Sequence, residues 1–273
     1  MTMIPSLVPP LPTENKWNRS LRPADAFEWL SDGWKDLWVQ PVTSLGYGVV
    51  VFLVSISIVA GLYLLGWDYI LFPAFAGFMV VGPIIAVGLY ETSRRIAAGE
   101  PTSWKDILLI HPKSGGQILF TGVLLCLLML VWMRAAVLIY ALFFGMLPFP
   151  GLDQIVPMLF KTEVGWAMLI VGGLVGGLFA SFSFAISAFS IPMLLNEKTD
   201  ALTAMGSSMA LVWNNLPAML TWGAIVLALF LFSLATGLVG LIVVFPLLGH
   251  GTWHAYQAVA PIDLSPASVR SGH

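Results

Sequence analysis

The residues of this sequence that could do chemistry are few and far apart. His250 and His254 stand four residues apart, a spacing that places both imidazoles on one face of a helix and suits a pair of metal ligands. Glu91 and Asp200 could complete a carboxylate-rich site with them. Both histidines also lie among aromatic residues typical of a membrane surface, where imidazoles hydrogen-bond to loops or lipid headgroups. We therefore treat His250 and His254 as weak metal candidates and expect no cofactor.

Arg134 is a second candidate, because it lies inside a long apolar stretch. It stands eleven residues before Gly145, about 16 Å from that end at 1.5 Å per residue. An arginine at the bilayer centre costs at least about 2.5 kcal/mol, so its side chain should face protein or water. One hypothesis is an interhelical staple to Tyr140, Asn214, Asn215 or helix carbonyls. Contact with an anionic substrate or lipid, or with a partner subunit, stays open.

The elements that must position these residues are six apolar stretches. They cover residues 42–65, 70–90, 117–145, 166–195, 216–235 and 238–258. About 20 apolar residues cross a bilayer as a helix, whereas a core helix of a soluble protein is shorter. The sequence therefore predicts an all-α, polytopic membrane protein with six transmembrane helices arranged as three hairpins, with short amphipathic cytoplasmic helices between them.

Composition excludes several classes of protein. The chain is 58% hydrophobic and only 10% charged, against about 25% charged in globular domains. The net charge of −2 indicates no nucleic acid partner. The single cysteine, Cys126, excludes an internal disulfide and an iron–sulfur cluster held by this chain alone. The four histidines are too few for a catalytic haem–copper oxidase subunit, and no catalytic residues are expected.

The distribution of positive charge predicts the orientation. Of the 12 Lys and Arg residues, all but Lys161 and Arg134 fall on one side of the six-span arrangement. Positive residues accumulate on the cytoplasmic side, so we expect a bacterial inner-membrane protein with both termini in the cytoplasm. The predicted divisions are a disordered cytoplasmic N-terminus (1–22), an amphipathic interfacial helix (23–40), the six-helix transmembrane domain (41–258) and a cytoplasmic tail (259–273).

A short motif suggests that the three hairpins are related. Trp34-Lys35-Asp36 recurs as Trp104-Lys105-Asp106, with a weaker copy at 210–215, and each copy precedes a span. Within the hairpins, a proline precedes an ionisable residue by eight positions in three places, and these residues are Glu91, Asp200 and His254. Pseudo-symmetric packing would make these three side chains converge around one cytoplasmic opening.

Two further patterns predict packing rather than chemistry. Trp29, Trp34 and Trp38 lie on the amphipathic segment 23–40, which favours an anchor in the headgroup region; a partner-binding helix is the alternative. The fourth span carries small residues at helical spacing, which let helices approach closely inside the bundle or in a homodimer. These residues are Gly172, Gly173, Gly176 and Gly177.

Two segments resemble a known family. They are EWLSDGWKDL at residues 28–37, which leads through Pro41 into the first span, and PLLGHGTWHAY at residues 246–256. Both are similar to an uncharacterised bacterial family of predicted integral membrane proteins, domain of unknown function 2189. The resemblance covers nearly the whole chain after about residue 20. Some members are labelled cytochrome c oxidase-like, so the resemblance implies that an association with a respiratory complex is worth testing.

Two functions remain open from the sequence. The first is a structural or accessory membrane protein, in contact with membrane lipids and with partner membrane subunits of a complex such as a respiratory one. The alternative is a small transporter or channel with a polar path past Arg134 and the cluster of Glu91, Asp200 and His254. A continuous polar cavity would favour the transporter.

Overall fold

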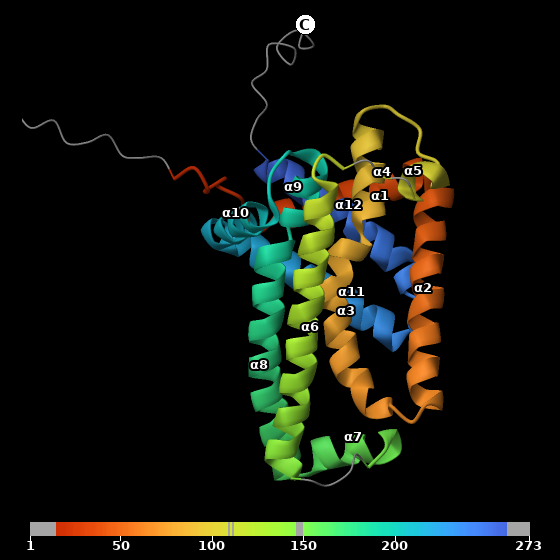
Figure 1. The fold of residues 1–273 in the computed structure, drawn as a ribbon, viewed down its shortest axis with the longest axis vertical. Helices are drawn as coiled ribbons and strands as arrows, with labels where there is room; N and C mark the ends of the chain where they lie inside the picture. Colours follow the sequence, from red (N-terminus) through yellow and green to blue (C-terminus); the bar gives the residue numbers. More distant parts are fainter. Residues whose placement is uncertain (1–14, 109, 111, 146–149, 261–273) are drawn as a thin grey trace, which may run out of the picture.

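The computed structural model describes residues 15–108, 110, 112–145 and 150–260, and all regular secondary structure among them is helical (Figure 1). The first half contains α1 (Asp25–Val39), α2 (Pro41–Leu64), the 3₁₀ turn η1 (Asp68–Ile70), α3 (Leu71–Ile85), α4 (Val87–Ala97), α5 (Trp104–Leu108) and α6 (Gly115–Phe144). The second half contains α7 (Leu152–Lys161), α8 (Glu163–Ser187), α9 (Ser190–Asn196), α10 (Ala201–Asn214), α11 (Leu216–Ala235) and α12 (Leu241–Val259).

Five helical segments are long and apolar enough to cross a membrane. They are Pro41–Leu64, Leu71–Ala97, Gly115–Phe144, Glu163–Asn196 and Leu216–Ala235. They match the first five predicted spans, with α3 and α4 forming one segment and α8 and α9 another.

The sixth predicted span, 238–258, is not among these five segments. Its helix, α12, has 19 residues. Several polar side chains in its second half, His250, His254 and Gln257 among them, lower its hydropathy below that of a spanning helix. The prediction of exactly six spans is therefore not confirmed.

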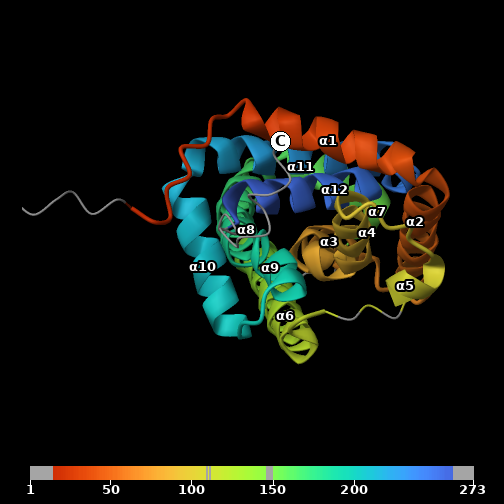
Figure 2. The same cartoon turned by 90° about the horizontal axis from the view of Figure 1, so that it is seen from above.

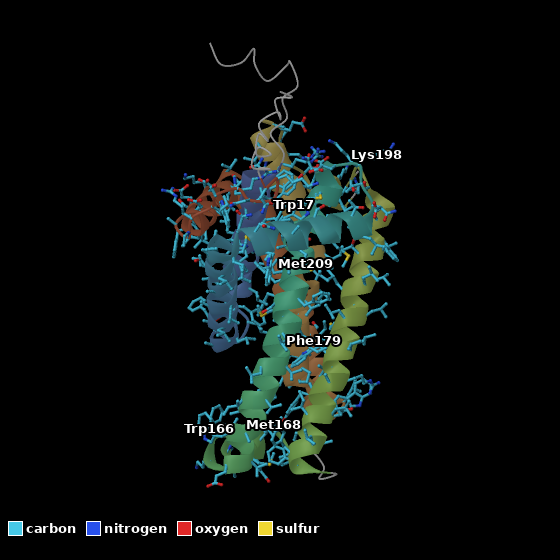
Figure 3. All side chains as sticks on the ribbon, turned by 90° about the vertical axis from the view of Figure 1, so that its left-hand side faces the viewer. Trp17, Trp166, Met168, Phe179, Lys198 and Met209 are labelled. Atoms are coloured by element: carbon cyan, nitrogen blue, oxygen red, sulfur yellow. The ribbon has the colours of Figure 1, made fainter. Side chains whose placement is uncertain are left out.

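The long helices turn large apolar side chains outward. Leu138, Leu174 and Leu178 are between 67% and 72% exposed. In Figure 3 the sticks between Met209 and Met168 are mostly carbon, and nitrogen and oxygen atoms gather towards the two ends. An apolar surface of this extent is stable against lipid rather than water.

Both ends of the described chain lie at the same end of the molecule, which we call the α1 end. There the Arg19 side chain donates a hydrogen bond from Nε to the carbonyl oxygen of Val259 at 3.0 Å. Helices α1, α9 and α10 lie at this end, and α7 lies at the opposite one (Figure 1).

Residues 15–22, predicted as part of a disordered N-terminus, are instead held by polar contacts. The side chain of Asn15 donates to Asn214 at 2.6 Å, and the backbone N–H of Arg19 donates to Asn215 at 2.9 Å. Asn215 in turn donates to the carbonyl oxygen of Trp17 at 2.9 Å. The side-chain amides of Asn214 and Asn215, at the end of α10, thus supply hydrogen-bond partners to a segment that has no helix or strand of its own. The predictions for residues 1–14 and 261–273 lie outside the described residues.

The core at the α1 end depends on close helix crossings. α1 lies along α12 (Figure 2), and a Cβ added at Gly33 would stand 2.6 Å from the backbone nitrogen of Gly251. Trp29 of α1 meets Trp222 of α11 edge to face, with ring centroids 5.9 Å apart. Glycine is required where backbones approach this closely, because any side chain would separate the helices.

Local signals account for several helix ends. α2 begins at Pro41, whose fixed φ suits a first helical turn. Asp200 caps α10 by accepting a hydrogen bond from the Thr203 N–H at 2.9 Å. Gly66, at φ +70°, allows the chain to turn after α2.

Candidate functional site

A buried chain of hydrogen bonds joins four helices at the α1 end. Ser44 Oγ of α2 lies 2.9 Å from His250 Nε2 of α12, and His250 Nδ1 lies 2.7 Å from Ser93 Oγ of α4. Ser93 donates to Asp36 Oδ2 of α1 at 2.6 Å. His254 Nε2 lies 2.9 Å from the same carboxylate oxygen. We call these five residues the Asp36–His250 network.

The network is almost completely removed from solvent. Ser44 and His250 are 0% exposed, and Ser93 is 1% exposed. Only His254, at the edge, retains a side chain that is 22% exposed. Buried polar groups of this kind must satisfy one another, because no water compensates for a lost partner.

The contacts fix one direction of donation through the network. Because Ser93 gives its only hydroxyl proton to Asp36, its oxygen must accept from His250, which places a proton on Nδ1. His250 Nε2 is then the acceptor for the Ser44 hydroxyl. His254 donates through Nε2 to the carboxylate. Every described donor in the network thus points towards Asp36.

Asp36 is the charged end of the network. Burial raises the pKa of Asp36, but the hydrogen bonds from His254 and Ser93 and the electrostatic attraction of His254 together outweigh it, so the pKa lies below its usual value. The network therefore contains an ionised carboxylate at neutral pH, held by donors on two other helices.

A serine bonded to a histidine is the arrangement that activates a nucleophile in many hydrolases. Here the Ser44 hydroxyl is 0% exposed, and Ser44 and His250 do not line the cavity described below. No substrate atom can approach the oxygen in this conformation. The network ties α1, α2, α4 and α12 together rather than presenting a reactive group.

The structure does not arrange His250 and His254 as the metal-binding pair that the sequence suggested. Both ring nitrogens of His250 are engaged by serine hydroxyls, and the carboxylate beside His254 is Asp36, not Glu91 or Asp200. Within the described ranges, no group of three or more His, Cys, Asp or Glu side chains is placed to hold a metal ion.

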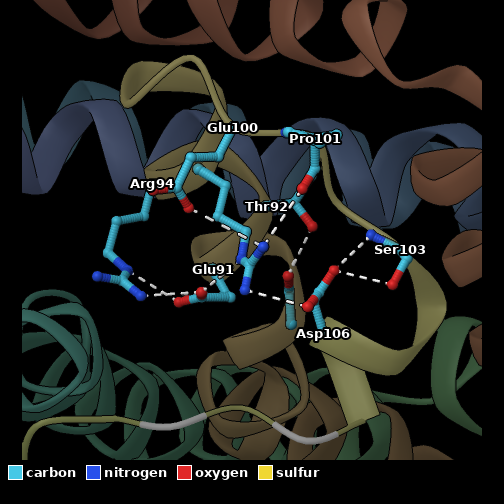
Figure 4. Close-up of polar contacts among 9 residues, drawn as sticks. Glu91, Thr92, Arg94, Glu100, Pro101, Ser103 and Asp106 are labelled. Carbon is cyan, nitrogen blue, oxygen red and sulfur yellow. Dashed lines mark hydrogen bonds and ion pairs between the residues drawn. The ribbon is translucent and has the colours of Figure 1, made fainter.

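Glu91 belongs to a second polar cluster, on α4 (Figure 4). Its side chain is 3% exposed and receives two hydrogen bonds from Arg94, at 2.8 and 2.9 Å, and one from Arg95 at 3.0 Å. Arg95 also pairs with Asp106 of α5 at 3.1 Å. Asp106 accepts from the backbone and side chain of Ser103, both at 2.8 Å. The cluster fixes the loop between α4 and α5 against α4.

The two copies of the Trp-Lys-Asp motif make comparable contacts. Asp36 of the first copy bonds to Ser93, and Asp106 of the second pairs with Arg95, so both aspartates attach a surface helix to α4. The structure thus gives the motif a local role, and the threefold internal repeat stays a prediction.

The proposed convergence of Glu91, Asp200 and His254 has no contact to support it. Glu91 is bonded to arginines, Asp200 is an exposed helix cap and His254 is bonded to Asp36. Among the described residues, no hydrogen bond or ion pair joins one of the three to another. Each is explained by its own neighbours, and the shared opening stays a prediction.

Arg134 lies on α6, a helix that is longer than a bilayer core is thick. Trp132, two residues earlier, donates its indole N–H to the carbonyl oxygen of Pro73 at 3.1 Å. Pro73 is the third residue of α3, directly after the turn that follows α2. Helix α6 has 30 residues, about 45 Å, so it exceeds the roughly 30 Å of a bilayer core. The distance from Gly145 therefore does not by itself fix the depth of Arg134 in a membrane, and that depth stays a prediction.

The side chain of Arg134 is exposed, and it takes part in none of the hydrogen bonds or ion pairs found among residues 15–108, 110, 112–145 and 150–260. Asn214 and Asn215, suggested as its partners, bind the N-terminal segment instead. Substrate, lipid or partner contact for Arg134 stays a prediction.

The three tryptophans of α1 divide between two faces. Trp29 is 5% exposed and packs inward on Trp222. Trp34 and Trp38 are 45% and 55% exposed and contact each other edge to face at 5.7 Å. Only the outward pair is available to a membrane surface, so the predicted anchor of three tryptophans is reduced to two.

The four glycines of α8 also divide. A Cβ at Gly176 would stand 2.9 Å from the Trp132 ring of α6, and one at Gly172 would stand 3.9 Å from Ile139. Gly173 and Gly177 are exposed, and added Cβ atoms there would meet nothing within 4 Å. One pair thus faces α6, and the other forms a flat strip on the outside of the bundle.

Sequence reasoning found His250 and His254 but missed their partners Asp36, Ser44 and Ser93. The one available signal was the Trp-Lys-Asp motif, which marked Asp36 without indicating its contact. Serines 44 and 93 stand near helix ends with no distinctive spacing.

Residues 71–196 match the model of a family of predicted integral membrane proteins, domain of unknown function 2189. This match confirms the family noted in the sequence over residues 71–196, which contain neither of the two segments that carried the resemblance. The chain is a predicted integral membrane protein with several apolar helices. No curated protein and no solved structure matches the chain.

Proposed function

We propose that this chain is a structural or accessory protein of the bacterial inner membrane, with six passes and both termini in the cytoplasm. The observation that carries this proposal is the placement of buried polar groups. Asp36 and Glu91 are paired with neighbouring side chains at the α1 end, whereas the cavity between the helices is lined mainly by apolar residues. Such an interior suits stable packing rather than passage of a polar substrate.

The orientation follows from the positive charges. Arg19, Arg94 and Arg95 belong to the α1 end, and Lys161 ends α7 at the opposite one. By the positive-inside rule, the α1 end faces the cytoplasm. In the six-pass arrangement, α12 runs beside α11 and returns the chain to the α1 end. The polar second half of α12 packs there against α1, α2 and α4.

An accessory role needs a surface for a partner membrane subunit. The outer strip at Gly173 and Gly177 suits this purpose, because small residues four positions apart let a second helix approach closely. Leu174 and Leu178 beside them are 67% and 72% exposed and would supply apolar contact. The resemblance to a family with oxidase-like labels makes a subunit of a respiratory complex one class of partner to look for.

The test is purification of the tagged protein from its native membrane in a gentle detergent. We expect a second membrane protein in a fixed ratio, and its loss when Gly177→Leu obstructs the strip. Gly61→Leu is the matched control, because Gly61 is also a helical glycine whose added Cβ meets nothing within 4 Å. A particle that contains one copy of this chain and lipid alone, from wild type as well as variants, would contradict the accessory role.

A further inference from the structure

A cavity of about 130 Å³ lies between α3, α8, α11 and α12, outside the Asp36–His250 network. On α12 its lining extends from Leu241 to Thr252, about 16 Å along the helix axis. The cavity is therefore a narrow slot that follows the long direction of the bundle.

The slot is apolar along its shaft and polar at one end. Phe78 stacks on Phe230 with centroids 5.7 Å apart and meets Phe245 at 5.9 Å, and all three line the shaft. Towards the α1 end the lining includes the hydroxyl-bearing residues Tyr90 and Ser187. No charged residue is among the lining residues described. A ligand for this slot would be a hydrocarbon with a neutral hydrogen-bonding group at one end.

The slot opens sideways between α8 and α11. Ala180 of α8 lines the cavity and is exposed, and Val226 of α11 lines it and is partly exposed. The backbone of α11 packs on α1, α10 and α12. On the side that faces α8, the contact to α11 is made by a side chain: a Cβ at Gly223 of α11 would stand 4.0 Å from the Phe184 ring of α8. This mouth faces the surface that lipid would occupy.

We propose that the slot binds one acyl chain of a membrane lipid from the leaflet at the α1 end. The polar end of the slot lies towards that face, so an ester carbonyl there could accept a hydrogen bond from Tyr90 or Ser187 while the hydrocarbon follows the aromatic shaft. An engineered cavity of about 150 Å³ holds benzene, so a volume of about 130 Å³ accommodates only a short segment of one acyl chain, and the length of the slot along α12 favours a chain over a ring.

The test uses purified full-length protein in detergent, titrated with a phosphatidylcholine that carries a photoreactive diazirine in one acyl chain. We expect labelling to saturate near one lipid per protein, with cross-links on the α8 and α11 peptides that contain Phe184 and Val226. Lipid at the outer surface would give labelling that rises without saturation over many peptides.

Gly82→Leu is the variant that fills the slot, because Gly82 lines it and an added Cβ there meets nothing within 4 Å. We expect at least a fivefold loss of the saturable label in this variant and none in Gly61→Leu, which leaves the slot open. If Gly82→Leu elutes as aggregate in size-exclusion chromatography, Val226→Phe takes its place, because Val226 also lines the slot. Unchanged saturable labelling in a folded slot-filling variant, or labelling only at outward positions of the wild type, would overturn the proposal.

Discussion

The buried network depends on Asp36, because every other side chain in the network donates a hydrogen bond and the ionised Asp36 carboxylate only accepts. Ser93 and His254 both donate to the same carboxylate oxygen. Hydrogen bonds to a charged group contribute about 1.5–3 kcal/mol each, and a donor left unpaired in a buried site costs a similar amount.

We expect Asp36→Asn to lower the free energy of unfolding in detergent by about 1–3 kcal/mol, since the amide keeps the shape but loses the charge. Asp32→Asn is the matched control on the same helix. The side chains of its ion pair with Lys35 are 42% and 69% exposed, so solvent screens the pair and its contribution to stability is small. Thermal or denaturant unfolding of both variants measures the difference. Equal losses would contradict the role of Asp36.

The same residue predicts a pH dependence. Because the pKa of Asp36 is lowered in the folded protein, the folded state binds the proton less tightly than the unfolded chain does. Its contribution to stability is therefore complete above the unfolded value of about 4 and is lost as the pH falls through the folded pKa. Comparing the unfolding of wild type and Asp36→Asn at each pH therefore reports the contribution of the Asp36 carboxylate together with the hydrogen bonds that it accepts.

We expect the stability difference between wild type and Asp36→Asn to shrink as the pH falls below about 4, because the carboxylate of the wild type then becomes protonated. Unfolding curves from pH 7 to pH 3 measure it. A difference that grows towards acid pH would contradict the assignment of Asp36 as the ionised group.

At the scale of the elements, α12 is held by glycine crossings. An added Cβ at Gly48 of α2 would overlap the carbonyl group of Ile242, and one at Gly33 of α1 would collide with Gly251. Backbone cannot yield as a flexible side chain can, so these helices would have to separate.

Gly48→Ala should therefore destabilise the protein by about 1–3 kcal/mol, although alanine is the better helix former. Gly61→Ala on the same helix has open space and should be neutral or slightly stabilising. Unfolding measurements on the two variants decide the point, and a neutral Gly48→Ala would show that α2 and α12 do not cross as described.

The helices themselves were predictable, because runs of apolar residues dominate their sequences. The first five spans and the amphipathic segment at 23–40 correspond to described helices. The apolar first half of α12 made it look like a sixth spanning helix. The polar side chains of its second half hydrogen-bond to residues of α1, α2 and α4. The hydrophobic periodicity of one segment does not reveal its contacts with segments that are distant in the sequence. For the same reason the Trp-Lys-Asp motif marked Asp36 without revealing its contacts with Ser93 and His254.

At the scale of the whole molecule, polar chemistry and apolar space are separated. The buried network and the Glu91 cluster lie at the α1 end, and the slot between the helices is apolar along its shaft. This separation is what distinguishes the proposed accessory role from the transporter alternative, which requires water to reach the interior.

Cysteine accessibility tests that separation directly. In a Cys126→Ala background, which removes the only native thiol, Ser44→Cys places a reactive group inside the network, and Lys35→Cys provides an exposed control. With a water-soluble maleimide, we predict rapid labelling at position 35, and labelling at position 44 only after unfolding in denaturant. Equally rapid labelling of both positions in the folded protein would show water at Ser44 and contradict the closed, structural network.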